Sequence, residues 1–128
     1  YGLPEDAIKG GLSVSGVFDL QPIRYTLMQP LLQIDDGIVV RNSPLRMAQR
    51  RTRAPLIFSV GGDEPAEFQR QTAEFQQHWQ AAGNAASFVP QPGANHFDAI
   101  YGFEDPKSPL CRALFRMMNV APRSTGRP

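Results

Sequence analysis

The sequence has 128 residues and a formal net charge of +1. This length allows one small domain with a modest core and leaves little room for a second. The near balance of charge argues against a protein that binds nucleic acid or a membrane surface, because such proteins concentrate basic residues on one face. The one cluster of arginines lies between Arg46 and Arg53 and contains no aromatic residue. We interpret it as a solvated surface.

Cysteine usage and hydropathy bear on location. Cys111 is the single cysteine and lies in an apolar run, so it cannot form an internal disulfide, and we predict a buried structural thiol. No apolar run approaches the roughly 20 residues that a membrane helix requires. The first residues lack the basic and apolar regions of a signal peptide. A cytoplasmic protein is therefore expected, and the absence of an initial methionine indicates that the chain starts inside a longer one.

The first third of the chain predicts one strand and an irregular segment. Residues 12–18 form a short apolar run after Gly10 and Gly11, which is typical of a buried strand in a parallel sheet. Residues 21–42 contain two prolines and show weak periodicity, so short helical pieces in irregular structure are expected there. Residues 42–44 (Asn-Ser-Pro) predict a turn.

The remaining chain predicts two strands, each followed by a helix. Residues 54–60 (APLIFSV) are the strongest strand, and residues 86–89 are a shorter one. Between them, Phe68, Phe75, Trp79 and Ala82 recur at helical spacing, with Pro65 suited to the first turn and residues 83–84 to the end. A last helix is predicted where Leu110, Leu114 and Met117 share one face. Residues 121–128 are polar and predicted to be disordered.

Strands that alternate with helices predict an α/β fold, a parallel sheet covered on both faces in three α/β/α layers. Three strands make a thin sheet, and one edge would lie bare unless more chain is present. We therefore expect either homo-oligomerisation or pairing with a missing amino-terminal half.

Two loops after predicted strands carry residues suited to acid–base chemistry. Asp63 follows the strongest strand through Gly61 and Gly62, and His96 follows the last one. Function in open α/β sheets collects at these strand ends. A carboxylate that orients a histidine is the acid–base half of a nucleophilic triad, and we predict that Asp63 and His96 hydrogen-bond. Taken singly, Asp63 could equally be a helix cap and His96 an ordinary loop residue. His78 is predicted to lie on a helix surface, and no metal site or cofactor is expected.

Several stretches together resemble the carboxyl-terminal half of an α/β-hydrolase, specifically the kynurenine formamidase (arylformamidase) group of small esterases. The matching stretches are SGVFDLQPI at residues 15–23, SP at 43–44, PLIFSVGGDEPAEFQRQTAEF at 55–75 and NHFD at 95–98. The most specific is EFQRQ at residues 67–71. Gln29 departs from the family pattern, which often has asparagine there.

The resemblance implies that residues 1–120 are the carboxyl-terminal part of one α/β-hydrolase domain. By residue matching, the triad acid falls on Asp63, with the adjacent Glu64 as the alternative, and the histidine falls on His96. The family's serine nucleophile and oxyanion motif lie upstream of every matched stretch, so the nucleophile is expected outside this chain. The implied reaction is Ser-His-Asp cleavage of a formamide or short ester, with N-formylkynurenine, an intermediate of tryptophan degradation, as the implied substrate.

A sequence that resembles a nucleophile motif occurs near the start of the chain. Residues 11–15 (GLSVS) are one residue short of the G-x-S-x-G elbow, in which a sharp turn leads from a strand into a helix. No helical pattern follows Ser13, so we predict that Ser13 lies within a strand and that neither it nor Ser15 is the nucleophile. Without a nucleophile the isolated chain would be inactive. The alternative function is therefore a non-catalytic fragment that acts as a structural or interaction domain.

Overall fold

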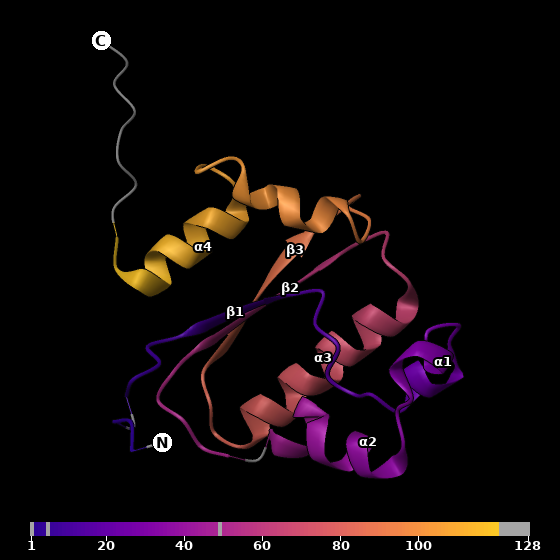
Figure 1. The fold of residues 1–128 in the computed structure, drawn as a ribbon. Coiled ribbons are helices and arrows are strands. Elements are labelled where there is room, and N and C mark those ends of the chain that lie inside the picture. The colour runs from indigo at the N-terminus through magenta and orange to yellow at the C-terminus, as the bar shows by residue number, and fades with distance from the viewer. Residues whose placement is uncertain (1, 5, 49, 121–128) are drawn as a thin grey trace.

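A computed structural model describes residues 2–4, 6–48 and 50–120. Strands β1 (Gly11–Val14), β2 (Leu56–Gly61) and β3 (Ala86–Gln91) form one parallel sheet in the order β1-β2-β3 (Figure 1). The predicted α/β class with a parallel sheet is confirmed. The tail for which disorder was predicted, residues 121–128, lies outside the described residues.

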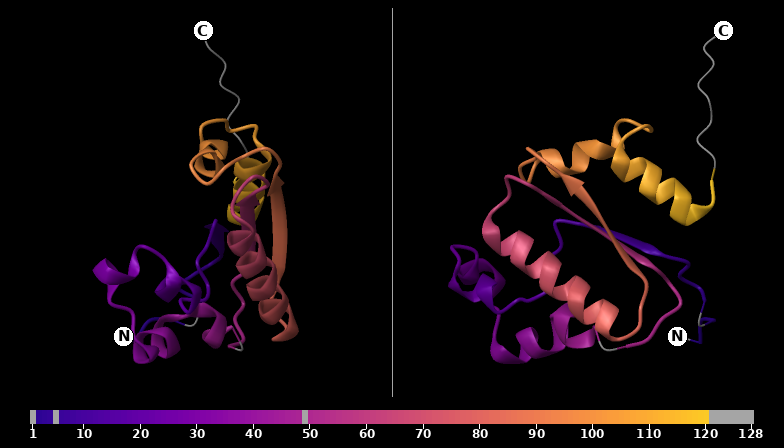
Figure 2. Two further views of the ribbon diagram at one scale, coloured as in Figure 1. Left: turned by 90° about the vertical axis from the view of Figure 1, so that its right-hand side faces the viewer. Right: turned by 180° about the vertical axis from the view of Figure 1, so that it is seen from behind.

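Two helices cover the two faces of the sheet. Helix α3 (Ala66–Ala81) and helix α4 (Pro109–Met118) lie on opposite sides of the strands in Figure 1 and in the rear view of Figure 2. Neighbouring residues of β2 point to opposite faces, because side chains alternate along a strand. Phe58 accordingly packs on the α3 side, and Ile57 packs on the α4 side. The predicted three layers are confirmed.

Each face has its own apolar cluster. On the α3 side, Phe18, Phe58 and Phe75 form an aromatic core, with the rings of Phe18 and Phe75 stacked at a centroid distance of 4.3 Å. The cluster on the α4 side consists of Ile57, Val89, Leu110 and Ala113, with Leu12, Val14 and Met117 packed against it. The predicted stripe on α3 is confirmed for Phe75, which is buried, and for Trp79, which is half-buried against this core.

The segment between β1 and β2 contains short helical pieces, as its sequence predicts. They are η1 (Pro22–Tyr25), α1 (Gln29–Leu32), α2 (Asp36–Asn42) and η2 (Pro44–Met47). After β3, a 3-10 helix, η3 (Asp98–Phe103), precedes α4. The prediction of a first strand over residues 12–18 is wrong at its far end. The strand ends at Val14, because Ser15 adopts a left-handed conformation with φ of 52° that cannot continue a strand.

The sequence interpretations of several single residues are confirmed. Cys111 is a free, buried thiol on α4. His78 is exposed on α3, and the four arginines of the cluster at residues 46–53 are exposed. Within the described residues, no helix is long and apolar enough to cross a membrane.

We predict that replacing Phe58 with alanine destabilises the fold strongly. The ring is fully buried and meets both Phe18 and Phe75 edge-on, so its removal leaves a cavity and should lower the free energy of unfolding by about 3–5 kcal/mol. Urea unfolding measures this difference. Phe97→Ala is the control, because that ring is 79% exposed and its loss should cost about 0.5 kcal/mol or less. Equal losses in the two variants would contradict the aromatic core.

Candidate active site

The loops after the three strands bring three polar side chains together. Because the strands are parallel and adjacent, their carboxyl ends lie at the same edge of the sheet. Ser15 follows β1, Glu64 follows β2 and His96 follows β3. The side chains of Ser15 and His96 both contact the carboxylate of Glu64, so the three strand ends form one hydrogen-bonded group.

The carboxylate of Glu64 is the centre of this group. Its side chain has no exposed surface. Its Oε1 accepts hydrogen bonds from the Ser15 hydroxyl at 2.5 Å and from the Gly61 backbone N–H at 2.8 Å. Its Oε2 lies 2.8 Å from Nδ1 of His96. Both carboxylate oxygens therefore have partners, which a buried charge requires.

The predicted hydrogen bond between Asp63 and His96 is wrong, because the partner of His96 is Glu64, the alternative acid. Asp63 lies in the tight turn after β2 and is exposed. Its backbone N–H donates to the carbonyl of Ala94, which fixes the turn against the histidine loop. The next residue, Glu64, then points back under the strand end. Sequence spacing alone could not separate these neighbouring carboxylates.

Close backbone packing holds this turn in place. A Cβ on Gly61 would lie 2.2 Å from the carbonyl oxygen of Ala94, so only glycine fits there. Gly62 donates its N–H to the carbonyl of Gln91, and the side-chain amide of Gln69 donates to the carbonyls of Gly62 and Glu64. The turn and the histidine loop are therefore fixed to each other through the backbone.

The charge of Glu64 determines which tautomer His96 adopts. Burial acts to raise the pKa of Glu64, but hydrogen bonds from Ser15, Gly61 and His96 outweigh it, and the pKa lies below its usual value of 4.5. The ionised carboxylate can only accept, so Nδ1 of His96 carries the proton and donates. In the neutral ring Nε2 is left with a free lone pair. An imidazole in this state is suited to accept a proton.

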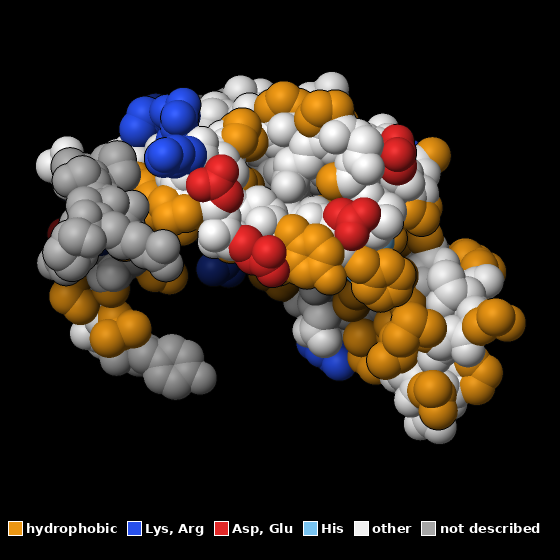
Figure 3. Space-filling model, turned by 90° about the horizontal axis from the view of Figure 1, so that it is seen from above, with side chains coloured by type: hydrophobic (Ala, Val, Ile, Leu, Met, Phe, Trp, Pro, Cys, Tyr) orange, Lys and Arg blue, Asp and Glu red, His pale blue; other side chains and the backbone are white. Residues whose placement is uncertain are grey.

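Aromatic side chains frame the imidazole of His96, whose side chain is 47% exposed. The Phe68 ring lies at a centroid distance of 4.7 Å, and the Phe97 ring approaches edge-on at 5.9 Å. Hydrophobic side chains are frequent on the face of the molecule seen in Figure 3. Several large exposed ones come from the histidine loop and η3, namely Phe97, Ile100, Tyr101 and Phe103. The Phe68 and Phe97 rings therefore give the imidazole of His96 apolar neighbours.

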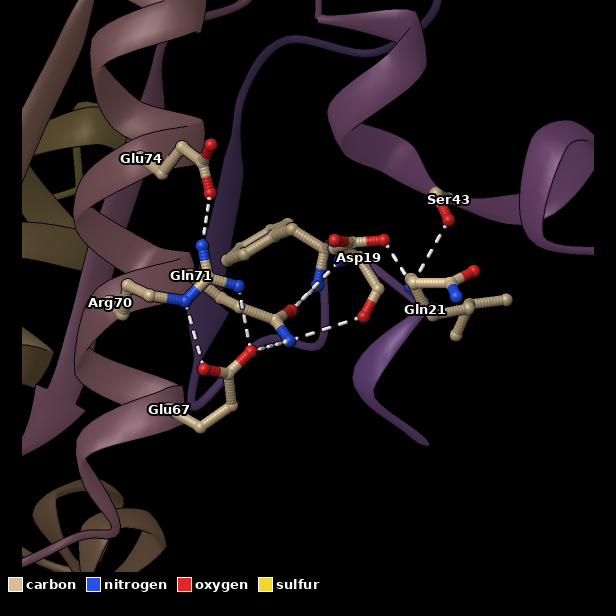
Figure 4. Close-up of polar contacts among 9 residues, drawn as sticks. Asp19, Gln21, Ser43, Glu67, Arg70, Gln71 and Glu74 are labelled. Atoms are coloured by element: carbon tan, nitrogen blue, oxygen red, sulfur yellow. Dashed lines mark hydrogen bonds and ion pairs between the residues drawn. The ribbon is translucent and has the colours of Figure 1, made fainter. Parts of the chain in front are cut away.

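A buried amide on α3 holds the segment that follows Ser15. Oε1 of Gln71 accepts the backbone N–H groups of Phe18 and Asp19, each at 2.8 Å, and its Nε2 donates to the Asp19 carbonyl and to Glu67 (Figure 4). Arg70 binds the same Glu67 carboxylate, and hydrogen bonds from Arg70 and Gln71 lower the pKa of Glu67 to about 2. Helix α3 thus anchors the chain beyond β1.

Ser13 in β1 and Ser15 just after it differ in their surroundings. Ser13 lies within the strand, which confirms that it is not at an elbow. Ser15 donates its hydroxyl to the carboxylate of Glu64, whereas a triad nucleophile donates to the histidine. Sequence reasoning missed the contacts of Ser15 and Gln71. Both residues lie in stretches that resemble the formamidase group, but no spacing rule assigns their partners.

The described residues also contain a hollow, which lies away from Glu64 and His96. This hollow, of about 660 Å³, is lined by Arg51, Thr52, Arg53 and Gly83, which precede β2 and β3 and so lie at the opposite end of the strands. Among residues 2–4, 6–48 and 50–120, no three His, Cys, Asp or Glu side chains are grouped so that they could hold a metal ion.

Comparison with characterised sequences identifies relatives of one kind. No protein-family model matches the chain. It is 30% identical over 115 residues to a kynurenine formamidase of Danio rerio, and 26% identical over 116 residues to one of Salmo salar. Each match covers 87% of this chain but only 39% and 40%, respectively, of the relative. The chain thus spans about two fifths of the length of the curated relatives it matches.

Solved structures with a similar fold are hydrolytic enzymes. A protein of Silicibacter sp. described as a thioesterase superposes with a TM-score of 0.70 at 28% identity, over 80% of this chain and 37% of that one. An acylaminoacyl peptidase of Pyrococcus horikoshii gives 0.64 at 17% identity, over 96% and 22%. Esterase 2 of Thermogutta terrifontis gives 0.61 at 20% identity, over 90% and 44%. The chain has the fold of the carboxyl-terminal portion of an α/β-hydrolase and is homologous to kynurenine formamidases.

We predict that the ionised carboxylate of Glu64 stabilises the fold at neutral pH and that this stabilisation is lost in acid. Because its folded pKa lies below 4.5, its contribution is present above that pH and is lost as the pH falls through the folded value. Glu64→Gln should therefore lower the free energy of unfolding by about 1–3 kcal/mol at pH 7. The difference from wild type should shrink below pH 4.5. Urea unfolding at several pH values measures it, with Asp63→Asn as a control that changes little. A difference that stays constant down to pH 3 would contradict the assignment.

We predict that Gln71→Leu loosens the segment after Ser15. The substitution leaves the N–H groups of Phe18 and Asp19 without their acceptor, so the free energy of unfolding should fall by about 2–4 kcal/mol. Hydrogen exchange at these two amides should accelerate. Gln77→Leu, on an exposed position of α3, should change neither quantity. Unchanged hydrogen exchange at Phe18 and Asp19 in Gln71→Leu would show that the Gln71 amide does not hold this segment.

Proposed function

We propose that this chain carries the general base, His96, and its orienting acid, Glu64, of a serine hydrolase that cleaves a formamide or short ester. In this proposal, residues 1–120 are the carboxyl-terminal part of the hydrolase domain. In this proposal the nucleophilic serine and the oxyanion donors belong to a segment that corresponds to the part of the relatives that this chain does not span. The observation that carries the proposal is the buried carboxylate bonded to Nδ1 of a half-exposed histidine at the strand ends.

The geometry supports a division of labour between the two side chains. Glu64 fixes the imidazole through Nδ1, so Nε2 is directed to the reacting group. When Nε2 accepts the proton of the nucleophile, the ring becomes an imidazolium, and the adjacent carboxylate stabilises the new positive charge. Because Glu64 is buried, water does not screen this interaction strongly.

The two halves of the reaction use the same proton carrier. First, the serine oxygen attacks the formyl or acyl carbon while His96 takes the hydroxyl proton. The bond from that carbon to the leaving amine or alcohol then breaks as His96 returns the proton to the leaving group. In the second half, His96 takes a proton from water, which attacks the acyl-enzyme. The carboxylic acid leaves, formic acid in the case of a formamide, and the serine regains its proton.

The choice of N-formylkynurenine as the substrate rests on two observations. The relatives with the matches above are named kynurenine formamidases. Around His96, the Phe68 and Phe97 rings provide an apolar surface that suits an aromatic leaving amine. Short acyl esters present the same acyl carbon, so we expect them to be cleaved as well.

Substitutions at the neighbouring residues Asp63 and Glu64 test which carboxylate orients His96. In the intact protein, His96→Ala and Glu64→Ala should each lower kcat for N-formylkynurenine or p-nitrophenyl acetate by about 10³-fold or more, because base or tautomer control is lost. Asp63→Asn alters the adjacent carboxylate, which is exposed, and should retain kcat within about twofold.

The outcomes separate the alternatives. A loss of activity in Asp63→Asn with full activity in Glu64→Ala would overturn the assignment of the acid. If the intact wild-type protein cleaves neither substrate, the hydrolase proposal itself fails, and the alternative of a non-catalytic structural or interaction domain is favoured.

A further inference from the structure

The hydroxyl of Ser15 also belongs to the group formed with Glu64 and His96, but the roles proposed for those two residues do not use it. It lies 2.5 Å from Oε1 of Glu64, on the carboxylate oxygen that does not contact His96. The other donor to Oε1 is the Gly61 backbone N–H. The Gly61 N–H and the His96 imidazole each hold one oxygen of the carboxylate. The Ser15 hydroxyl adds a second donor to Oε1 from the residue after β1, which restricts rotation of the carboxylate further and helps direct Oε2 to Nδ1.

The backbone of Ser15 is held on both sides in an unusual conformation. Its N–H donates to the carbonyl of Ser59 at 2.9 Å, which continues the ladder between β1 and β2 by one residue. Its φ of 52° lies in the left-handed region, which costs about 1 kcal/mol or more for a residue other than glycine. This conformation turns the chain out of the strand at the point where the hydroxyl meets Glu64.

The residues that follow Ser15 lock this turn. A Cβ on Gly16 would lie 2.4 Å from the Phe18 ring and 2.6 Å from the Ser13 hydroxyl, so the chain packs back on itself too closely for a side chain there. Phe18 is buried in the aromatic core, and its N–H is bound by Gln71. Core packing and the hydrogen bonds with Gln71 thus fix the position of the Ser15 hydroxyl in the absence of a ligand.

We propose that Ser15 is a positioning residue of the Glu64–His96 pair, whose hydroxyl orients the carboxylate of Glu64 toward Nδ1. This inference rests on the proposed function for its effect on catalysis, but its effect on Glu64 does not require activity. The hydroxyl also favours the ionised carboxylate, because it donates to the charged form. The titratable side chain that faces Glu64 is His96. Among the described residues, no other charged side chain hydrogen-bonds to Glu64, and Asp63 is exposed beside it in the chain.

Titration of Glu64 in the intact protein tests the inference directly. The side-chain carboxyl carbon, labelled with ¹³C, is followed by NMR against pH in wild type, Ser15→Ala, Ser15→Gly and Ser13→Ala. Loss of the hydroxyl should raise the pKa of Glu64 by about one unit in both Ser15 variants. The matched serine variant two residues earlier, Ser13→Ala in β1, should leave the pKa of Glu64 unchanged. An unchanged pKa in Ser15→Ala, or an equal rise in Ser13→Ala, would overturn the inference.

The pair of Ser15 variants separates the hydroxyl from the backbone. Glycine adopts a positive φ without strain, whereas alanine does not. Both variants should lower kcat about tenfold, with KM within about twofold, because the hydroxyl acts on the histidine and not on ligand binding. Full kcat in Ser15→Gly would show that only the backbone matters and would overturn the inference. If wild type has no hydrolase activity, the proposed function fails, while the Glu64 titration still decides the role of Ser15.

Discussion

The buried carboxylate of Glu64 is the constraint around which the ends of all three strands are arranged. A charge without solvent exposure is costly unless each oxygen is hydrogen-bonded. The hydroxyl of Ser15 after β1, the N–H of Gly61 at the end of β2 and the imidazole of His96 after β3 supply the required donors. The requirement to solvate one anion therefore fixes the relative positions of three loops that are far apart in the sequence.

The rest of the fold makes this arrangement rigid. The central strand β2 contributes Phe58 to one apolar cluster and Ile57 to the other, so both helices are anchored to the strand that leads into the Glu64 turn. The absence of a side chain at Gly61 allows the turn to contact the carbonyl of Ala94 in the histidine loop. Packing on both faces and close backbone contact at the strand ends thus fix the pair in place, as the proposed acid–base role requires.

Helix α3 joins the core to the site through polar contacts as well. Gln71 is buried and uses its amide to satisfy the backbone of Phe18 and Asp19, in place of a neighbouring strand or helix. Its partner Glu67 is held in turn by Arg70. A fully satisfied buried amide of this kind specifies one conformation of the loop, because any displacement would leave backbone groups without partners.

The sequence by itself determined the parallel α/β class, the two principal helices and the position of His96 after the last strand, because apolar periodicity and strand-end position are local signals that follow from burial. It narrowed the carboxylate partner of His96 to two adjacent residues, Asp63 and Glu64, but could not choose between them. That choice depends on how the turn after β2 packs against the histidine loop, in which His96 lies 32 residues from Glu64. The contact between Ser15 and Glu64 likewise joins residues that are 49 apart. Only the tertiary structure decided these contacts, because hydrogen bonds between distant loops leave no period or spacing in the chain.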